Sequence, residues 1–193
     1  MFTPEVLIGL RWVHIGAGIV WIGLLYWFNL VNVNYQKALD PALKGQVNPP
    51  LLGRALGWFR WSAVVTVTAG LLMIYGLYWQ DGDLFGSNTE ITIFVGGLLG
   101  LIMLFNVWVF IWPNQRAVLA GMRRGEAPDP ARMRTTLYAS RTNFVLSFPM
   151  LFFMAGSSHY PLDWAGVVIV GVVLAAVGLG AVLTVQKYRA ARF

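Results

Sequence analysis

Long hydrophobic runs, separated by short polar and basic stretches, dominate this sequence. Five runs are long enough for a helix to cross the roughly 30 Å hydrocarbon core of a bilayer at about 1.5 Å per residue. They span about residues 12–33, 57–79, 91–112, 142–158 and 164–186. The pattern predicts an all-α fold, an integral membrane bundle of five transmembrane helices in which residues 1–193 form a single domain.

The composition agrees with this fold and narrows the function classes. Of the 193 residues, 58% are hydrophobic and 11% are charged, which is typical of multi-pass membrane proteins. The sequence has no cysteine, which excludes disulfides, thiolate metal sites, iron–sulfur clusters and covalently attached c-type haem. Any haem in this chain therefore needs other ligands. Three prolines and a glycine between Asp40 and Pro50 predict an irregular cytoplasmic loop there.

Basic residues lie almost entirely on one side of the predicted bundle. Of the fourteen Lys and Arg residues, all but Arg11 fall before or at the start of the second run, before the fourth run or in the C-terminal tail. The opposite loops hold Asp81, Asp83, Glu90 and Asp163. The positive-inside rule then predicts a multi-pass membrane protein with its N-terminus outside and its C-terminus in the cytoplasm. The basic loops are expected to act as topology signals that can contact anionic lipid, and no nucleic-acid binding is expected.

A histidine inside the first apolar run, His14, is the strongest candidate for chemistry. An ionisable side chain within a bilayer is costly, so it usually faces protein, a cofactor or water. At helical spacing, His14 shares a face with Gly18 and Trp21. The opposite face carries a glycine every seven residues: Gly9, Gly16 and Gly23. Since such a stripe lets another helix approach closely, we expect the first helix to be contacted on both sides.

The second histidine, His159, follows the fourth run, and the predicted topology places it on the same side of the membrane as His14. The depths of the two residues should agree within about one helical turn, roughly 5 Å. Each histidine has a small residue one turn deeper, Gly18 for His14 and Ala155 for His159. A flat macrocycle could fit there. The two imidazoles would then be the axial ligands of the iron of one b-type haem.

Two further residues would complete such a haem site. Trp21 would form an apolar wall, and Arg11 lies where it could pair with the propionates. Other interpretations stay open, namely another metal or a quinone, or purely structural roles. In the structural case, His14 hydrogen-bonds a neighbouring carbonyl and His159 is stabilised by the dipole at a helix C-terminus. Two histidines are too few for a closed all-histidine metal site.

Several motifs resemble a known family. They are Arg-Trp-Val-His-Ile-Gly-Ala-Gly-Ile-Val-Trp-Ile-Gly at 11–23, Trp-Phe-Arg-Trp at 58–61, Asn106 with Trp-Pro-Asn-Gln-Arg at 112–116, and the segments 140–154 and 158–161. Over most of the chain, these are similar to the N-terminal membrane domain of the bacterial membrane-bound, cytochrome c-linked urate oxidases. The resemblance implies a multi-pass protein of the bacterial inner membrane, a redox role facing the periplasm and electron exchange with cytochrome c. His14 and His159 fall on the family's histidine positions.

The chain also differs from those enzymes, which are longer and carry a C-terminal cytochrome c with a Cys-x-x-Cys-His motif. We therefore expect a short standalone relative, a b-type haem electron-transfer protein that exchanges electrons with periplasmic cytochrome c, alone or within a larger membrane redox complex. One alternative is a haem-free structural or accessory subunit of a respiratory or photosynthetic complex. Another is a urate-oxidising enzyme that uses an external cytochrome c, so whether the protein is an enzyme stays open.

Overall fold

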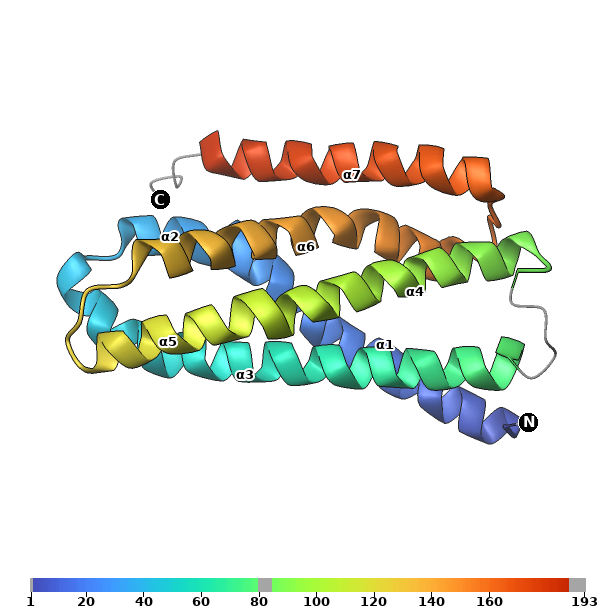
Figure 1. The fold of residues 1–193 in the computed structure, drawn as a ribbon, viewed down its shortest axis with the longest axis horizontal. Coiled ribbons are helices and arrows are strands. Elements are labelled where there is room, and N and C mark those ends of the chain that lie inside the picture. The colour runs from blue at the N-terminus through green and yellow to red at the C-terminus, as the bar shows by residue number, and fades with distance from the viewer. Residues whose placement is uncertain (1, 80–84, 188–193) are drawn as a thin grey trace.

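The structure, a computed structural model, describes residues 2–79 and 85–187. Asp81 and Asp83 lie outside the described residues. Within them, all regular structure is helical, as predicted (Figure 1). The α-helices and the π-helical segments, labelled η, are α1 (Pro4–Tyr26), η1 (Trp27–Asn32), α2 (Val33–Ala38), α3 (Pro41–Ile74), η2 (Tyr75–Trp79), α4 (Asn88–Asn106), η3 (Val107–Ile111), α5 (Trp112–Arg123), α6 (Pro130–Gly156) and α7 (Trp164–Lys187).

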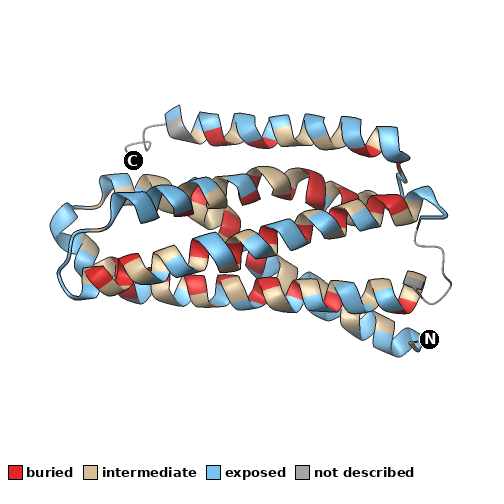
Figure 2. Cartoon of the chain, viewed as in Figure 1, coloured by how far each residue is buried: buried red, intermediate tan, exposed pale blue. Residues whose placement is uncertain are grey.

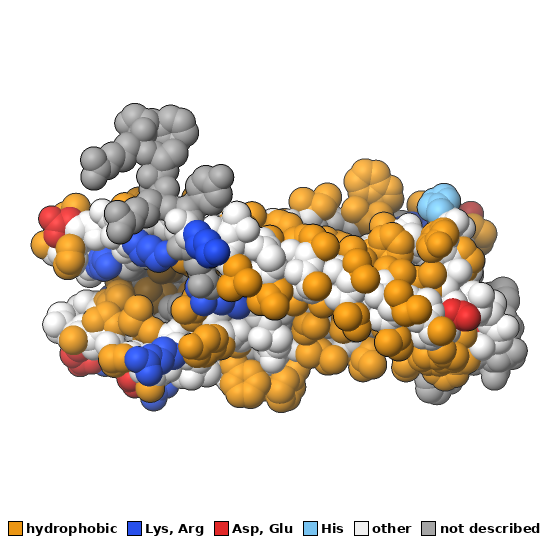
Figure 3. Space-filling view, turned by 90° about the horizontal axis from the view of Figure 1, so that it is seen from above, with side chains coloured by type: hydrophobic (Ala, Val, Ile, Leu, Met, Phe, Trp, Pro, Cys, Tyr) orange, Lys and Arg blue, Asp and Glu red, His pale blue; other side chains and the backbone are white. Residues whose placement is uncertain are grey.

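The π-helical segments extend or join α-helices, so the chain forms five long helical rods that alternate in direction (Figure 1). The connections from α2 to α3 and from α5 to α6 lie at one end of the bundle, where Lys and Arg side chains gather on the face seen in Figure 3. We call this the basic end. The first helix begins at the opposite end, and α7 runs toward the basic end.

Four helices are long and apolar enough to cross a membrane by length and composition. They cover Pro4–Ala38, Pro41–Tyr78, Asn88–Arg123 and Trp164–Val185. The remaining predicted span, residues 142–158, lies in α6 and the turn that follows it. Because α6 begins with a basic stretch and carries polar residues such as Asn143 and Ser147 between its apolar ones, it is not among these four. The count of five spans and their orientation stay predictions.

The prediction of an irregular loop at residues 40–50 is wrong, because helix α3 begins at Pro41. Asp40 caps this helix, and its side chain accepts a 2.9 Å hydrogen bond from a backbone N–H two residues later. Pro49 and Pro50 lie inside the helix, where each lacks a backbone donor. Tertiary contacts compensate, since buried Asn48 exchanges hydrogen bonds of 2.7 and 2.9 Å with Gln36 of α2.

The packing of the rods buries the sides that face one another (Figure 2). The first helix packs mainly on α3, and α6 packs on both α4 and α7. A large core includes Trp21, Phe59, Met103 and Phe144. A smaller core at the end opposite the basic end consists of four buried residues: Ile91, Phe153, Leu162 and Val167. The bundle is therefore held by apolar packing along most of its length.

The glycine face of α1 is not covered by another described helix. Gly9, Gly16 and Gly23 are exposed, and a Cβ atom at any of them would meet nothing within 4 Å. The prediction that α1 is contacted on both sides is therefore wrong for the described part of this chain. The face that carries His14 and Gly18 packs on α3.

Buried polar side chains join α6 to its neighbours. Asn143 is fully buried, accepts a 2.8 Å hydrogen bond from Nδ2 of Asn106 and donates a 2.9 Å hydrogen bond to the carbonyl oxygen of Met103. One turn earlier on α6, the hydroxyl of Ser140 accepts a 2.9 Å hydrogen bond from Nδ2 of Asn29. These bonds satisfy groups that would be costly to bury alone, and they fix how α6 is placed against η1 and α4.

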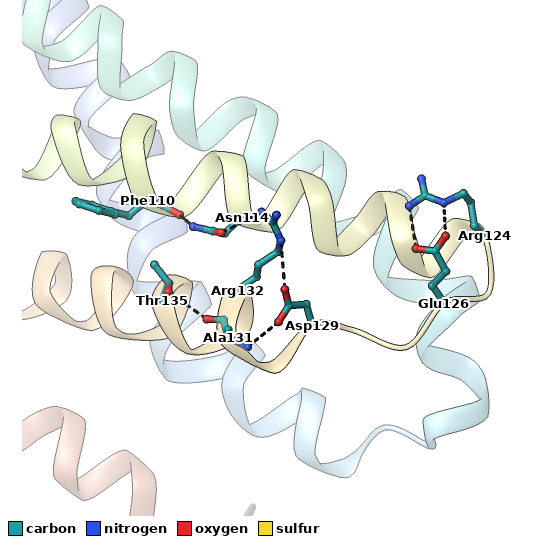
Figure 4. Close-up of polar contacts among 8 residues, drawn as sticks. All are labelled: Phe110, Asn114, Arg124, Glu126, Asp129, Ala131, Arg132 and Thr135. Atoms are coloured by element: carbon teal, nitrogen blue, oxygen red, sulfur yellow. Dashed lines mark hydrogen bonds and ion pairs between the residues drawn. The ribbon is translucent and has the colours of Figure 1, made fainter.

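The turn between α5 and α6 is fixed by local polar contacts at the basic end (Figure 4). Asp129 caps α6 and pairs with Arg132 at 3.4 Å, and Nη1 of Arg132 donates to Oδ1 of Asn114 on α5. Within the turn, the side chain of Arg124 donates hydrogen bonds of 2.6 and 2.9 Å to Glu126. These bonds hold the pKa of the exposed Glu126 carboxyl below its ordinary value.

Candidate functional site

His14 is half-buried between α1 and α3, and its ring is anchored to the backbone of α3. Its Nδ1 atom lies 2.8 Å from the carbonyl oxygen of Thr66. A carbonyl oxygen can only accept, so the neutral ring carries its proton on Nδ1 and keeps a lone pair on Nε2. No described residue forms a hydrogen bond with Nε2. Metal-ligating histidines typically have this arrangement, and the bond to a neighbouring carbonyl is also what the structural interpretation predicts.

Two glycines set the surroundings of the His14 ring. A Cβ atom at Gly70, one turn after Thr66 on α3, would lie 2.9 Å from Cε1 and 3.1 Å from Nδ1 of His14. The absence of a side chain at Gly70 is therefore what lets the ring reach α3. At Gly18, a Cβ atom would lie 3.7 Å from the Thr66 methyl group. The room beside Gly18 is thus taken by α3. The sequence analysis did not single out Gly70.

His159 lies in the turn after α6, and its side chain is exposed. Its backbone N–H donates to the carbonyl oxygen of Gly156 at 2.9 Å. Ala155, at the end of α6, is exposed as well. Among the described residues, no hydrogen bond or close contact joins His159 to His14. A single site that uses both histidines therefore stays a prediction.

The other two residues predicted for the haem site differ in their surroundings. Arg11 is exposed, one turn before His14 on α1. Trp21 is 1% exposed and belongs to the large core, where its indole Nε1 is buried and has no hydrogen-bond partner among the described residues. Within the described ranges, no group of three or more His, Asp or Glu residues could hold a metal ion.

A second cluster, which the sequence analysis did not predict, lies between α3 and the η3–α5 rod. The guanidinium carbon of Arg60 lies 3.8 Å from the ring centroid of Trp112, 5.1 Å from that of Trp61 and 5.3 Å from that of Trp108. We call these four residues the arginine–tryptophan cluster. Arg60 belongs to the Trp-Phe-Arg-Trp motif and Trp112 opens the Trp-Pro-Asn-Gln-Arg motif, so two of the motifs that carry the family resemblance meet here.

The fold defines the class of this protein, which is an all-helical bundle. Its long helices are apolar enough to span a membrane, and polar side chains form hydrogen bonds between them. A family model described as Urate oxidase N-terminal matches residues 83–192, more than half of the chain. The chain therefore belongs to the urate oxidase N-terminal family. The matched part contains His159 and Trp112, whereas His14 and Arg60 precede it. No curated protein and no solved structure matches the chain.

Proposed function

We propose that this protein is an electron-transfer component of the bacterial inner membrane, related to the urate oxidase membrane domain, in which His14 holds a b-type haem through Nε2. The observation that carries the proposal is the anchoring of Nδ1 on the Thr66 carbonyl. When bound, the haem would supply a one-electron redox centre. Thr66 would keep the ring in the tautomer that can bind iron, and Gly70 would set the position of the ring.

In this proposal His159 is the second axial ligand, and the site faces the periplasm, where cytochrome c would exchange electrons with it. Two observations support the choice of His159. The fourth rod ends at the end of the bundle where α1 begins (Figure 1), and the His159 side chain is exposed. Arg11, also exposed on α1, would pair with the propionates. Trp21 and Ala155 complete the proposed surroundings, whereas the space beside Gly18 is filled by the Thr66 side chain.

Haem content and the spectrum of the purified protein test this proposal. Protein from a haem-sufficient host should give a b-type pyridine haemochrome and a reduced-minus-oxidised difference spectrum. His14→Ala and His159→Ala should each lose most of the haem. Gly70→Ala keeps both histidines but forces the His14 ring to shift, so it should lower the haem content or move the absorption bands and the midpoint potential. Gly16→Ala on the open face of α1 is the matched control and should leave all of these unchanged.

A second candidate function, a haem-free accessory subunit of a larger membrane complex, is favoured by a specific observation. Thr66 fills the space beside Gly18, and the bond from His14 to Thr66 by itself ties α1 to α3. For such a subunit, the protein from a haem-sufficient host should contain no haem, and native co-purification should recover it with other membrane proteins. For the haem proposal itself, full haem content in both His14→Ala and His159→Ala would refute the assignment of these two histidines as axial ligands.

A turnover assay distinguishes the remaining alternative, a urate-oxidising enzyme, from the electron-transfer component. Purified protein mixed with urate and oxidised cytochrome c should reduce the cytochrome only if the chain itself oxidises urate. An electron-transfer component should instead bind haem and show no reduction of cytochrome c by urate. If urate-dependent reduction is found and is lost in His14→Ala but kept in Gly16→Ala, the protein is an enzyme rather than a carrier.

A further inference from the structure

The arginine–tryptophan cluster holds a half-buried positive charge that has no carboxylate partner among the described residues. Arg60 forms neither of the two ion pairs found there. Its Nε atom and the indole Nε1 of Trp108 are buried N–H donors without acceptors, and they account for two of the four such polar atoms in the described part of the chain. Tryptophan faces stabilise the cation. They accept no ordinary hydrogen bond, so the cluster lacks an acceptor.

A hollow beside Trp112 lies next to this charge. It has a volume of about 340 Å³ and is lined by residues of one face of α5: Trp112, Pro113, Arg116, Ala117 and Ala120. The small side chains of Ala117 and Ala120 leave this space open. Arg116 adds a second cation, which has no ion-pair partner among the described residues. Trp112 both contacts the guanidinium of Arg60 and lines the hollow. One cation, Arg116, therefore lines a mostly apolar depression, and a second, Arg60, lies on the ring of Trp112, which lines it as well.

From the cluster toward the opposite end of the bundle, the surface is apolar. The rings of Trp61 and Trp108 meet at 5.5 Å, nearly at right angles, and join α3 to η3. Trp61 is 53% exposed, and Val65 follows it one helical turn later, also exposed. On the neighbouring rod, Phe105 lies three residues before Trp108 and is 55% exposed, with Leu101 exposed one turn further. The charged site thus continues directly into an exposed apolar seam.

We propose that the arginine–tryptophan cluster and the hollow bind the phosphate group of an anionic phospholipid, with an acyl chain along the seam between α3 and α4. A phosphate accepts charge-assisted hydrogen bonds from two arginines. The exposed seam favours a lipid over a soluble anion, because only the lipid also covers apolar surface. Basic residues at one membrane face are where acidic headgroups bind. The site uses neither histidine and is independent of the proposed haem.

Native mass spectrometry of delipidated protein in detergent tests the proposal. The probes are palmitoyl-oleoyl phosphatidylglycerol and phosphatidylcholine, which share acyl chains and differ in net charge. The protein should prefer phosphatidylglycerol. Arg60→Gln and Arg116→Gln should each weaken its binding by about tenfold, as expected for the loss of a charge-assisted hydrogen bond. Arg134→Gln, an exposed charge on α6, is the matched control and should keep the affinity. Ala120→Leu fills the hollow without changing a charge and should weaken binding similarly.

Three outcomes would overturn the proposal. Equal binding of the two lipids would show that charge does not matter. Equal losses in Arg60→Gln, Arg116→Gln and Arg134→Gln would mean a general basic surface without a defined site. Competition by millimolar inorganic phosphate, with no preference for the anionic lipid, would identify a soluble anion as the ligand. If circular dichroism shows that Arg60→Gln does not fold, Arg116→Gln and Ala120→Leu test the lipid site instead. Both substitutions alter the surface of α5 and leave the four residues of the arginine–tryptophan cluster unchanged.

Discussion

Replacing Gly178 with alanine tests whether α7 is held against α6 by close backbone contact. Gly178 is buried, and a Cβ atom there would lie 3.0 Å from Cδ2 of Phe148, 3.1 Å from Cα of Val145 and 3.2 Å from the Val145 carbonyl oxygen. A side-chain end can rotate away from a new methyl group. The backbone of α6 cannot, so α7 has to move outward and lose contacts along its length.

The expected magnitude follows from two opposing effects. Overpacking of this kind typically costs about 1–3 kcal/mol, whereas alanine gains up to about 1 kcal/mol over glycine in helix propensity. Gly180→Ala is the matched control, because Gly180 is exposed on the same helix and its Cβ atom would meet nothing within 4 Å. Gly180→Ala should show only the gain in helix propensity. The two variants should therefore differ in free energy of unfolding by about 1–3 kcal/mol.

Thermal unfolding in a fixed detergent, followed by tryptophan fluorescence, measures the difference. For a chain of this size, each 1 kcal/mol shifts Tm by about 2–4 °C. Gly178→Ala should melt below Gly180→Ala, and Gly180→Ala should melt at or above the wild type. Equal melting temperatures for the two variants would refute the reasoning, since they would mean that the contact between α6 and α7 is not close at Gly178.

Three further predictions concern other parts of the chain. Asn143→Ala removes two hydrogen bonds inside the bundle and should lower the free energy of unfolding by about 1–2 kcal/mol, which thermal unfolding would measure; an unchanged Tm would contradict the buried network. In the cysteine-free chain, Ser87→Cys should react with an impermeant maleimide in intact spheroplasts and Ala127→Cys only after lysis, and the reverse pattern would overturn the orientation. The Glu126 carboxyl should titrate below the ordinary pKa of glutamate by NMR, so its pair with Arg124 forms at neutral pH and is lost as the pH falls through that lowered pKa; an unchanged pKa in Arg124→Gln would contradict this cause.

Hydrophobic periodicity predicted the helical rods well but misplaced where some of them begin and end. Sequence reasoning treats proline as a helix breaker, yet α3 continues through Pro49 and Pro50. The buried pair of Asn48 and Gln36 that stabilises this segment joins two helices and has no signal within one of them. Likewise, the third rod continues past Pro113, where a π-helical turn precedes the proline. Local propensity cannot include such tertiary compensation.

For the candidate site, the sequence predicted the face of α1 that carries His14 and left its partner open. The structure provides the Thr66 carbonyl, a backbone atom that no side-chain motif can indicate. The bond of Asn106 to Asn143 likewise joins two helices that are distant in sequence. The contact of Arg60 with Trp112 was not foreseen, because the two residues lie 52 positions apart in sequence and no local pattern indicates how α3 lies against α5.

The largest helix interface, between α1 and α3, joins neighbours in the chain, with only Leu39 and Asp40 between α2 and α3. Closing so short a connection costs little entropy, so this pair can form as a helical hairpin soon after its synthesis. The later helices α4, α6 and α7 pack on one another around their own smaller core.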